Sequence, residues 1–113
     1  MIKWFLTAII FVHGLIHLIG VVSGLGIAKI EGFSGNTLIP LSGTLQTIFG
    51  VIWLIPVILF LIAATGLALN RQWWRMVAIG AAVISQILVI IWWPDAKFGT
   101  IANVLIVAGA LLI

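Results

Sequence analysis

Two histidines lie in a stretch of otherwise apolar residues near the start of the chain. His13 and His17 are four residues apart in FVHGLIHLIG, residues 11–20, so on a helix they would share one face. A neutral histidine donates one hydrogen bond and accepts another, and its imidazole also binds metals. Three roles stay open from this pair alone: hydrogen bonding between helices, contact with a small molecule, lipid or proton path, and ligation of a metal or haem.

Metal or haem binding needs more ligands than this pair supplies. Histidines at i and i+4 ligate zinc in HExxH helices, where a third ligand and a carboxylate base complete the site. This chain has no cysteine, and no acidic residue falls inside a predicted span. Haem held by two histidines normally requires them on facing helices, and here both fall on the first. We therefore predict no metal and no cofactor, and keep metal or haem binding as a lesser alternative.

The composition indicates that the histidines lie in a membrane. Of 113 residues, 65% are hydrophobic and only 6% are charged, which is too few ionic side chains to coat a soluble domain. The charged residues separate charge-free runs, and two of these, 4–28 and 76–94, match the ~20 residues that a helix needs to cross a ~30 Å hydrocarbon layer. The basic residues fall at predicted helix ends, so we expect membrane lipids as partners and no nucleic acid.

The charge-free runs predict an all-α, integral membrane, antiparallel four-helix bundle that forms a single domain over residues 1–113. The second charge-free run, 32–70, begins with GFSGNTLIPLSG. Its glycine, serine, asparagine and proline residues favour a loop over 29–43 before the second span. Pro56 is expected to kink the second span. Asp95 is expected to cap the start of the last one. The predicted spans are 4–28, 44–69, 73–93 and 96–113.

Four crossings would place both termini on the same side of the membrane. That side would carry Lys3, Arg71 and Arg75, and the opposite side Lys29 and Lys97. Because positively charged residues favour the cytoplasmic side, this bias predicts cytoplasmic termini in the inner (plasma) membrane of the cell.

Small residues continue the face that carries the histidines. Gly20 and Gly24 follow His17 at helical spacing and form a GxxxG pair, which allows another helix backbone to approach closely. The face should therefore pack against protein, since a histidine that faces hydrocarbon is costly. We expect Gly20 and Gly24 to pack helices within one bundle, and a homodimer interface is the alternative.

Polar partners for the histidines can be predicted from their depth. Counting ~1.5 Å per residue, His17 and Gln86 both lie about 20 Å from the inner boundary, and Asn103 reaches a similar level. With Ser85 they are predicted to form one polar layer, with His13 near the midplane and Gln46 close to the outer mouth. The predicted polar core or ligand-binding set is His13, His17, Gln46, Ser85, Gln86 and Asn103.

Several motifs give the chain a family resemblance. They are HGLIHLIG at 13–20, QWWRM at 72–76, SQILVII at 85–91 and DAKFGTIANV at 95–104. With these motifs the chain resembles an uncharacterised bacterial family of small four-helix membrane proteins, in which the same module also occurs ahead of a water-soluble domain. The resemblance implies the fold and no activity.

These patterns favour a non-enzymatic membrane module whose polar layer around the histidines stabilises the helix assembly and is able to hold a small ligand or a lipid. The alternative is a dimeric, proton-linked transporter of small molecules. The size resembles that of the small multidrug resistance transporters, but their acidic residue in the first helix has no counterpart here. Histidine would then have to serve as the titrating group.

Overall fold

The computed structural model describes residues 1–27, 34 and 36–113, and over these residues the protein is all-α, as predicted. Lys29, which contributes to the charge bias above, lies outside the described residues. The helices are α1 (Ile2–Ile16), α2 (Leu18–Gly24), α3 (Gly43–Ile52), α4 (Leu54–Ala68), α5 (Trp74–Ile91), α6 (Trp93–Ala96) and α7 (Gly99–Leu112).

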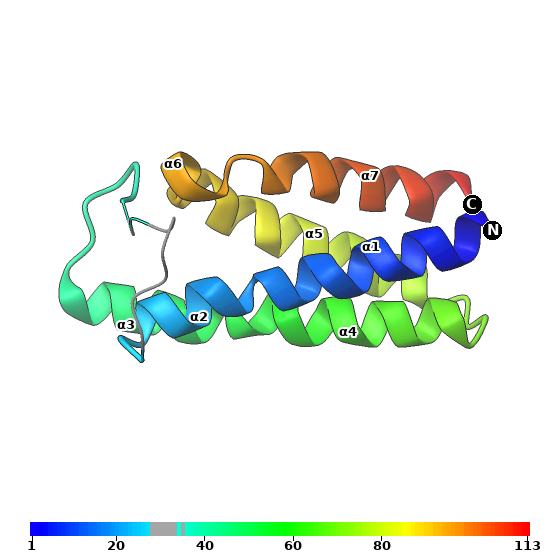
Figure 1. Cartoon of the computed structure of the whole chain (residues 1–113), viewed down its shortest axis with the longest axis horizontal. Helices are drawn as coiled ribbons and strands as arrows, with labels where there is room; N and C mark the ends of the chain where they lie inside the picture. The colour runs from blue at the N-terminus through cyan, green and yellow to red at the C-terminus, as the bar shows by residue number, and fades with distance from the viewer. Residues whose placement is uncertain (28–33, 35) are drawn as a thin grey trace.

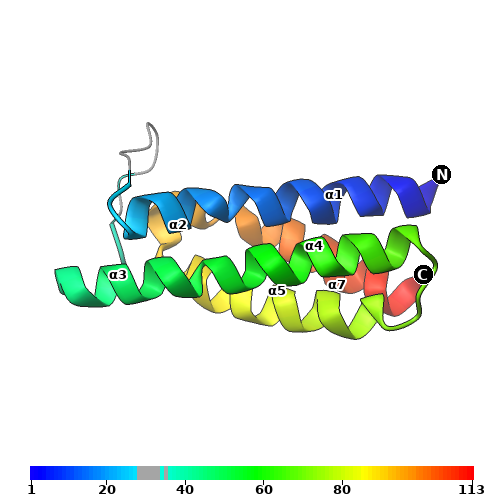
Figure 2. The same cartoon turned by 90° about the horizontal axis from the view of Figure 1, so that it is seen from below.

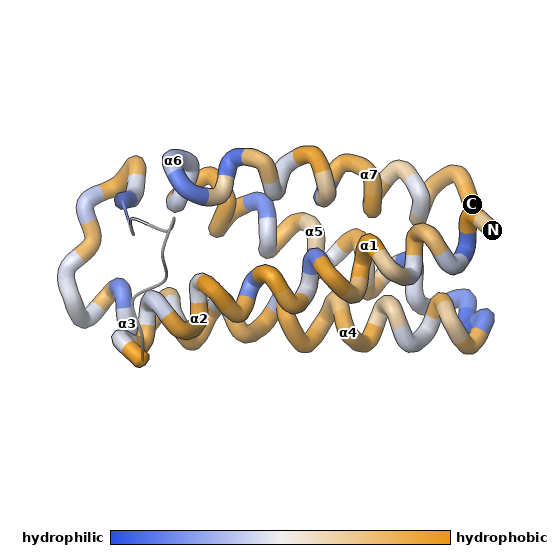
Figure 3. Tube along the Cα trace, viewed as in Figure 1, coloured by the Kyte–Doolittle hydropathy of each residue, from blue (hydrophilic) through white to orange (hydrophobic). Residues whose placement is uncertain are grey.

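Three helical stretches are long and apolar enough to cross a membrane, as in a multi-pass membrane protein. They are Ile2–Gly24, Gly43–Ala68 and Trp74–Ile91. The apolar helix α7 has 14 residues, which gives it a length of about 21 Å. Figure 3 shows mostly hydrophobic residues along these helices, with hydrophilic residues at their ends and at a few positions within them.

The helices form four rods: α1 with α2, α3 with α4, α5, and α7. The rods lie side by side, with both chain termini at one end (Figures 1 and 2). The rod formed by α1 and α2 packs against the rod formed by α3 and α4, and α7 packs against α1 and α5. The helix α5 also packs against α4. Successive rods run in opposite directions, so residues of α1, α5 and α7 that lie far apart in sequence face one another in the bundle.

Two of the rods change their helical geometry at single residues. The first does so at His17, whose backbone N–H donates to Gly14 O at 3.2 Å, a tighter bond than the usual one to the fourth residue back. The second divides at Trp53, three residues before Pro56. Because proline has no N–H, it cannot bond the carbonyl of Ile52, in keeping with the predicted irregularity in the second span.

The first span ends earlier than predicted, at Gly24 and not at residue 28. Gly26 has φ +69°, and the N–H of Ile27 donates to Val22 O at 3.0 Å. Together with the bond from Gly26 N to Ser23 O, this is the left-handed glycine cap that commonly ends helices. The sequence contains this signal in Gly26, whereas the predicted span follows the charge-free run to its end.

The start of the last helix also differs from the prediction. Asp95 does not cap it but lies within the short helix α6, and α7 begins at Gly99. The Asp95 carboxylate instead accepts hydrogen bonds from Ser34, from the backbone N–H at 3.0 Å and from the hydroxyl at 2.9 Å. Pro94 fits the first turn of α6, where a missing N–H costs nothing, so the chain makes an extra helical turn before α7.

The core consists of two apolar clusters with a polar layer between them. The cluster near the termini includes Ile10, Phe60 and Ile106. The cluster near the opposite end includes Val21, Trp53, Val57, Leu88 and Trp92. The buried polar residues of the described ranges lie between these clusters along the helices and are His13, His17, Ser85 and Asn103.

Candidate functional site

The glycines that follow His17 bring the first two rods into close contact. A Cβ on Gly20 would overlap the indole ring of Trp53, and one on Gly24 would lie 2.5 Å from Gly50 Cα. No side chain fits at either distance, so both positions require glycine for packing within the bundle. This contact holds Trp53 next to the histidines, with its ring centroid 5.5 Å from that of His17.

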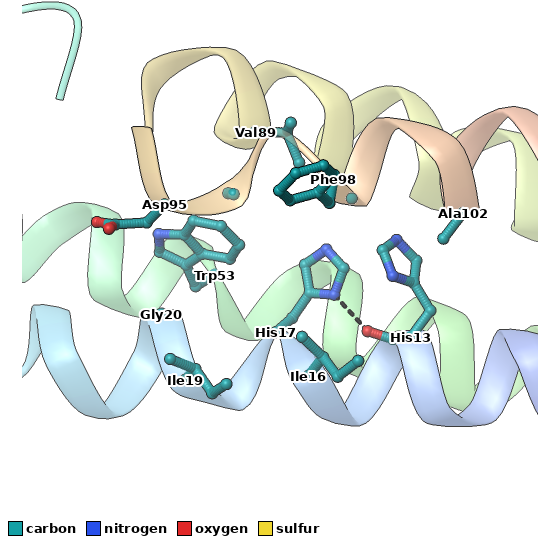
Figure 4. A pocket seen from close by; sticks show the side chains of 12 residues that line it. His13, Ile16, His17, Ile19, Gly20, Trp53, Val89, Asp95, Phe98 and Ala102 are labelled. Carbon is teal, nitrogen blue, oxygen red and sulfur yellow. Dashed lines mark hydrogen bonds between the residues drawn. The ribbon is translucent and has the colours of Figure 1, made fainter. Parts of the chain in front are cut away.

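His17 is buried and both of its ring nitrogens have protein partners. Its Nδ1 lies 2.6 Å from the backbone carbonyl oxygen of His13, one helical turn earlier, and its Nε2 lies 2.6 Å from the hydroxyl of Ser85 on α5. Figure 4 shows the first of these bonds. His17 therefore links the first rod to α5 directly.

His13 begins a chain of side-chain hydrogen bonds that joins three helices. Its Nε2 lies 2.8 Å from Asn103 Oδ1 on α7. Asn103 donates to Gln86 Oε1 on α5 at 3.0 Å, and Gln86 donates to Thr100 Oγ1 back on α7, also at 3.0 Å. Because each bond orients the next group, this chain has a single direction of donation.

The direction of donation fixes which nitrogen of each neutral ring carries the proton. An amide oxygen only accepts, so His13 must carry its proton on Nε2, and Nδ1 is left as an acceptor. A backbone carbonyl also only accepts, so His17 carries its proton on Nδ1 and accepts the Ser85 hydroxyl proton at Nε2. The two histidines are therefore expected to be opposite tautomers.

Both imidazole rings also line a cavity of about 310 Å³ between the first rod and the segment from α6 to α7. Figure 4 shows the rings rising from the first rod into this space, with Trp53 and Asp95 towards one end. The remaining lining is mostly apolar. It consists of Ile16, Ile19, Gly20, Val89, Ala96, Phe98, Gly99 and Ala102.

One buried donor of Trp53, a residue that lines the cavity, has no hydrogen-bond partner. Trp53 is 4% exposed, and among the buried side-chain nitrogen and oxygen atoms of the described residues its indole Nε1 is the one that lacks a hydrogen bond. A buried polar group without a partner costs about 1–3 kcal/mol.

The structure brings five of the six predicted polar-core residues together. His13, His17, Ser85, Gln86 and Asn103 form the layer, although Asn103 bonds His13 and not His17 as expected from depth. The rotation of α7 about its axis, which depth alone does not give, decides this pairing.

Gln46 lies apart from the layer. It is exposed on α3, and its amide donates to Leu41 O at 3.4 Å. The sequence prediction also missed Thr100, Trp53 and Asp95 as members of the site. Thr100 lies three residues before Asn103, so helical spacing alone places it on the same face.

The donor set does not favour a metal. No group of three or more metal-binding side chains occurs in the part of the chain that the structure describes. A neutral His17 uses both nitrogens for protein hydrogen bonds, so it has no free lone pair for a metal. Metal or haem binding through His17 would require one of its two hydrogen bonds to break.

No protein-family model, curated protein or solved structure matches this chain. The family resemblance drawn from the sequence motifs therefore stays a prediction, and the function is argued from the residues.

Proposed function

We propose that the protein is a non-enzymatic, four-crossing module of the cell inner membrane in which the histidine layer fixes the helices and forms the wall of a ligand-binding cavity. The observation that carries this proposal is the position of His13 and His17. Each ring is held by hydrogen bonds to other parts of the protein and also faces the same cavity. Such preorganised polar groups in a largely apolar cavity are typical of small-molecule sites.

The fourth crossing and the orientation are part of the proposal. The apolar helix α7 runs alongside α5 back to the end that holds the N-terminus (Figure 1). The guanidinium of Arg75 donates to Ala110 O near the end of α7 at 2.9 Å, which satisfies one of its last carbonyls. Lys3, Arg71 and Arg75 lie at this end, and their positive charge favours the cytoplasmic side.

Filling the cavity should remove the bound molecule without unfolding the protein. Gly99 lines the cavity, and a Cβ there would meet Val89 Cγ2 at 3.2 Å and His13 Cε1 at 3.6 Å. Gly99→Leu would place its remaining atoms in the open space, so we expect a co-purifying small molecule to fall about ten-fold in occupancy. Mass spectrometry of molecules extracted from the purified protein measures this occupancy.

The matched control is Gly80→Leu. Gly80 is exposed on α5, and a Cβ there would meet nothing within 4 Å, so this variant should retain the co-purifying molecule. Equal retention in both variants, or the same extract from wild type and from an unrelated membrane protein, would refute ligand binding at this cavity.

A further inference from the structure

A second, apolar groove adjoins the histidine cavity. This groove has a volume of about 360 Å³ and lies along α1 beside α7. Three residues, His13, Ile16 and Ala102, line both spaces. In Figure 4, His13 and Ala102 lie at the end of the cavity away from Asp95, so the groove begins where the cavity ends. The remaining wall of the groove consists of Phe5, Ala8, Ile9 and Val12.

The two spaces together form an elongated path along the first rod. On this rod the lining extends from Gly20, in the cavity, to Phe5, in the groove, which is about 22 Å of helix. Half of a ~30 Å hydrocarbon layer is about 15 Å. The path therefore runs in the direction of the acyl chains of a bilayer and is longer than one leaflet is deep.

The polar side chains in the cavity wall are largely engaged within the protein. Three of the four imidazole nitrogens have protein partners, namely His13 Nε2 and both nitrogens of His17. Trp53 Nε1 is buried, and the Asp95 carboxylate accepts hydrogen bonds from Ser34. A polar group drawn into this space would lose its bonds to water and find few replacements, which costs free energy. We therefore expect the part of a ligand that lies here to be apolar.

Both spaces open on the surface of the bundle. Ile16, at the junction, is 52% exposed, and Val12, in the groove, is 53% exposed. Both residues belong to the first of the helical stretches that are long and apolar enough to cross a membrane, so the opening meets lipid and not water. The phospholipids of the bilayer supply acyl chains at high concentration there, which favours their binding by mass action.

We propose that an acyl chain of a membrane phospholipid occupies the cavity and the groove, in contact with both imidazole rings. This inference rests on the proposed ligand-binding function and names the ligand class. The headgroup stays outside, at the bilayer surface beside α6, and the chain runs along α1 towards Phe5. A chain that fills the whole path makes contacts in the groove that a shorter chain lacks, so the site selects long chains.

The test titrates two phosphatidylcholines of different chain length, the dimyristoleoyl and the longer dioleoyl lipid, into the delipidated protein in detergent micelles. Native mass spectrometry measures the lipid-bound fraction. We expect wild type and Gly80→Leu to bind the dioleoyl lipid about five-fold more tightly. The micelle is itself apolar, so this difference comes from packing in the groove. Gly99→Leu, which fills the cavity, should bind neither lipid, and equal affinity of wild type for the two lipids would overturn the selection of long chains.

Ala102→Leu separates the cavity from the groove. Ala102 is partly buried and lines both spaces, so the added atoms project into the junction. This variant should keep its affinity for the dimyristoleoyl lipid within about two-fold and lose the preference for the dioleoyl lipid. Its thermal unfolding, followed by circular dichroism, should match that of Gly80→Leu. A folded variant that still prefers the longer lipid as strongly as wild type would show that the chain does not pass this junction.

The failure of the acyl-chain proposal is distinguishable from the failure of ligand binding. If the molecule that co-purifies with wild type and is lost in Gly99→Leu contains no acyl chain, the acyl-chain proposal is wrong while the cavity still binds a ligand. Oleic acid tests the source of the chain, since tighter binding of this free acid than of the dioleoyl lipid would refute a phospholipid. If neither lipid binds and no molecule co-purifies, both proposals fail.

Discussion

Replacing Gly24 by leucine is expected to lower the free energy of unfolding by about 3 kcal/mol, the largest loss from any single change considered. A Cβ at this position would lie 2.5 Å from Gly50 Cα and 3.0 Å from Gln46 O. Both neighbours are backbone atoms, so no side-chain rotation relieves the overlap. The first two rods must separate there, which also withdraws Trp53 from Gly20 and His17.

Reversible unfolding in mixed micelles, followed by circular dichroism, measures this loss. Gly43→Leu is the control, since a Cβ at Gly43 would meet nothing within 4 Å and the variant should stay near wild-type stability. A Gly24→Leu variant as stable as Gly43→Leu would show that α2 and α3 do not approach each other as described. The GxxxG pair would then serve some other contact, such as a homodimer interface.

Asn103→Leu should be the most damaging change within the polar layer, at about 2 kcal/mol. Asn103 is buried and bonds two side chains, His13 and Gln86, so its loss leaves one donor and one acceptor without partners. Interhelical hydrogen bonds in membrane proteins average only about 0.6 kcal/mol. The larger estimate reflects the two groups that would be left unsatisfied at once.

The control for this variant is Gln46→Leu, which also exchanges an amide for an apolar side chain. Gln46 is exposed and outside the layer, so its replacement should change the unfolding free energy by less than about 0.5 kcal/mol. Equal effects of the two variants in the same unfolding assay would mean that the layer contributes nothing specific to stability.

The inward direction of the histidine face could be predicted from the sequence because the physical penalties are large. A histidine in hydrocarbon is costly, and the glycines that follow at helical spacing restrict the face to close helix contact. These two constraints act on the same residues, His13 to Gly24. The structure accordingly places His13 and His17 in the core, and Gly20 and Gly24 against α3 and Trp53.

The pairing within the layer could not be predicted in the same way. Depth counted along a helix needs a known membrane boundary and says nothing about rotation. Depth therefore predicts His17 and Asn103 at one level, whereas in the structure Asn103 bonds His13. Gln46, also predicted for the layer, lies on the surface of α3 and bonds Leu41 O.

The residues that form the walls of the cavity could not be predicted from sequence patterns. It depends on the extra turn of α6, which moves the start of α7 to Gly99 and leaves Asp95 and Phe98 at the wall. A span predicted to begin at residue 96 contains no such turn. The position of Trp53 likewise depends on its packing against Gly20, a long-range contact between the first two rods.

The most direct test of the histidine layer is the tautomer of each ring in a lipid bilayer. The chain has two histidines, so solid-state nitrogen NMR of protein labelled with ¹⁵N-histidine resolves both without further labelling, and a His13→Asn variant assigns them. We expect His13 to carry its proton on Nε2 and His17 on Nδ1, as their partners Asn103 Oδ1 and His13 O require. Two rings that both carry the proton on Nε2, or that exchange freely with water, would contradict the layer on which the proposed function depends.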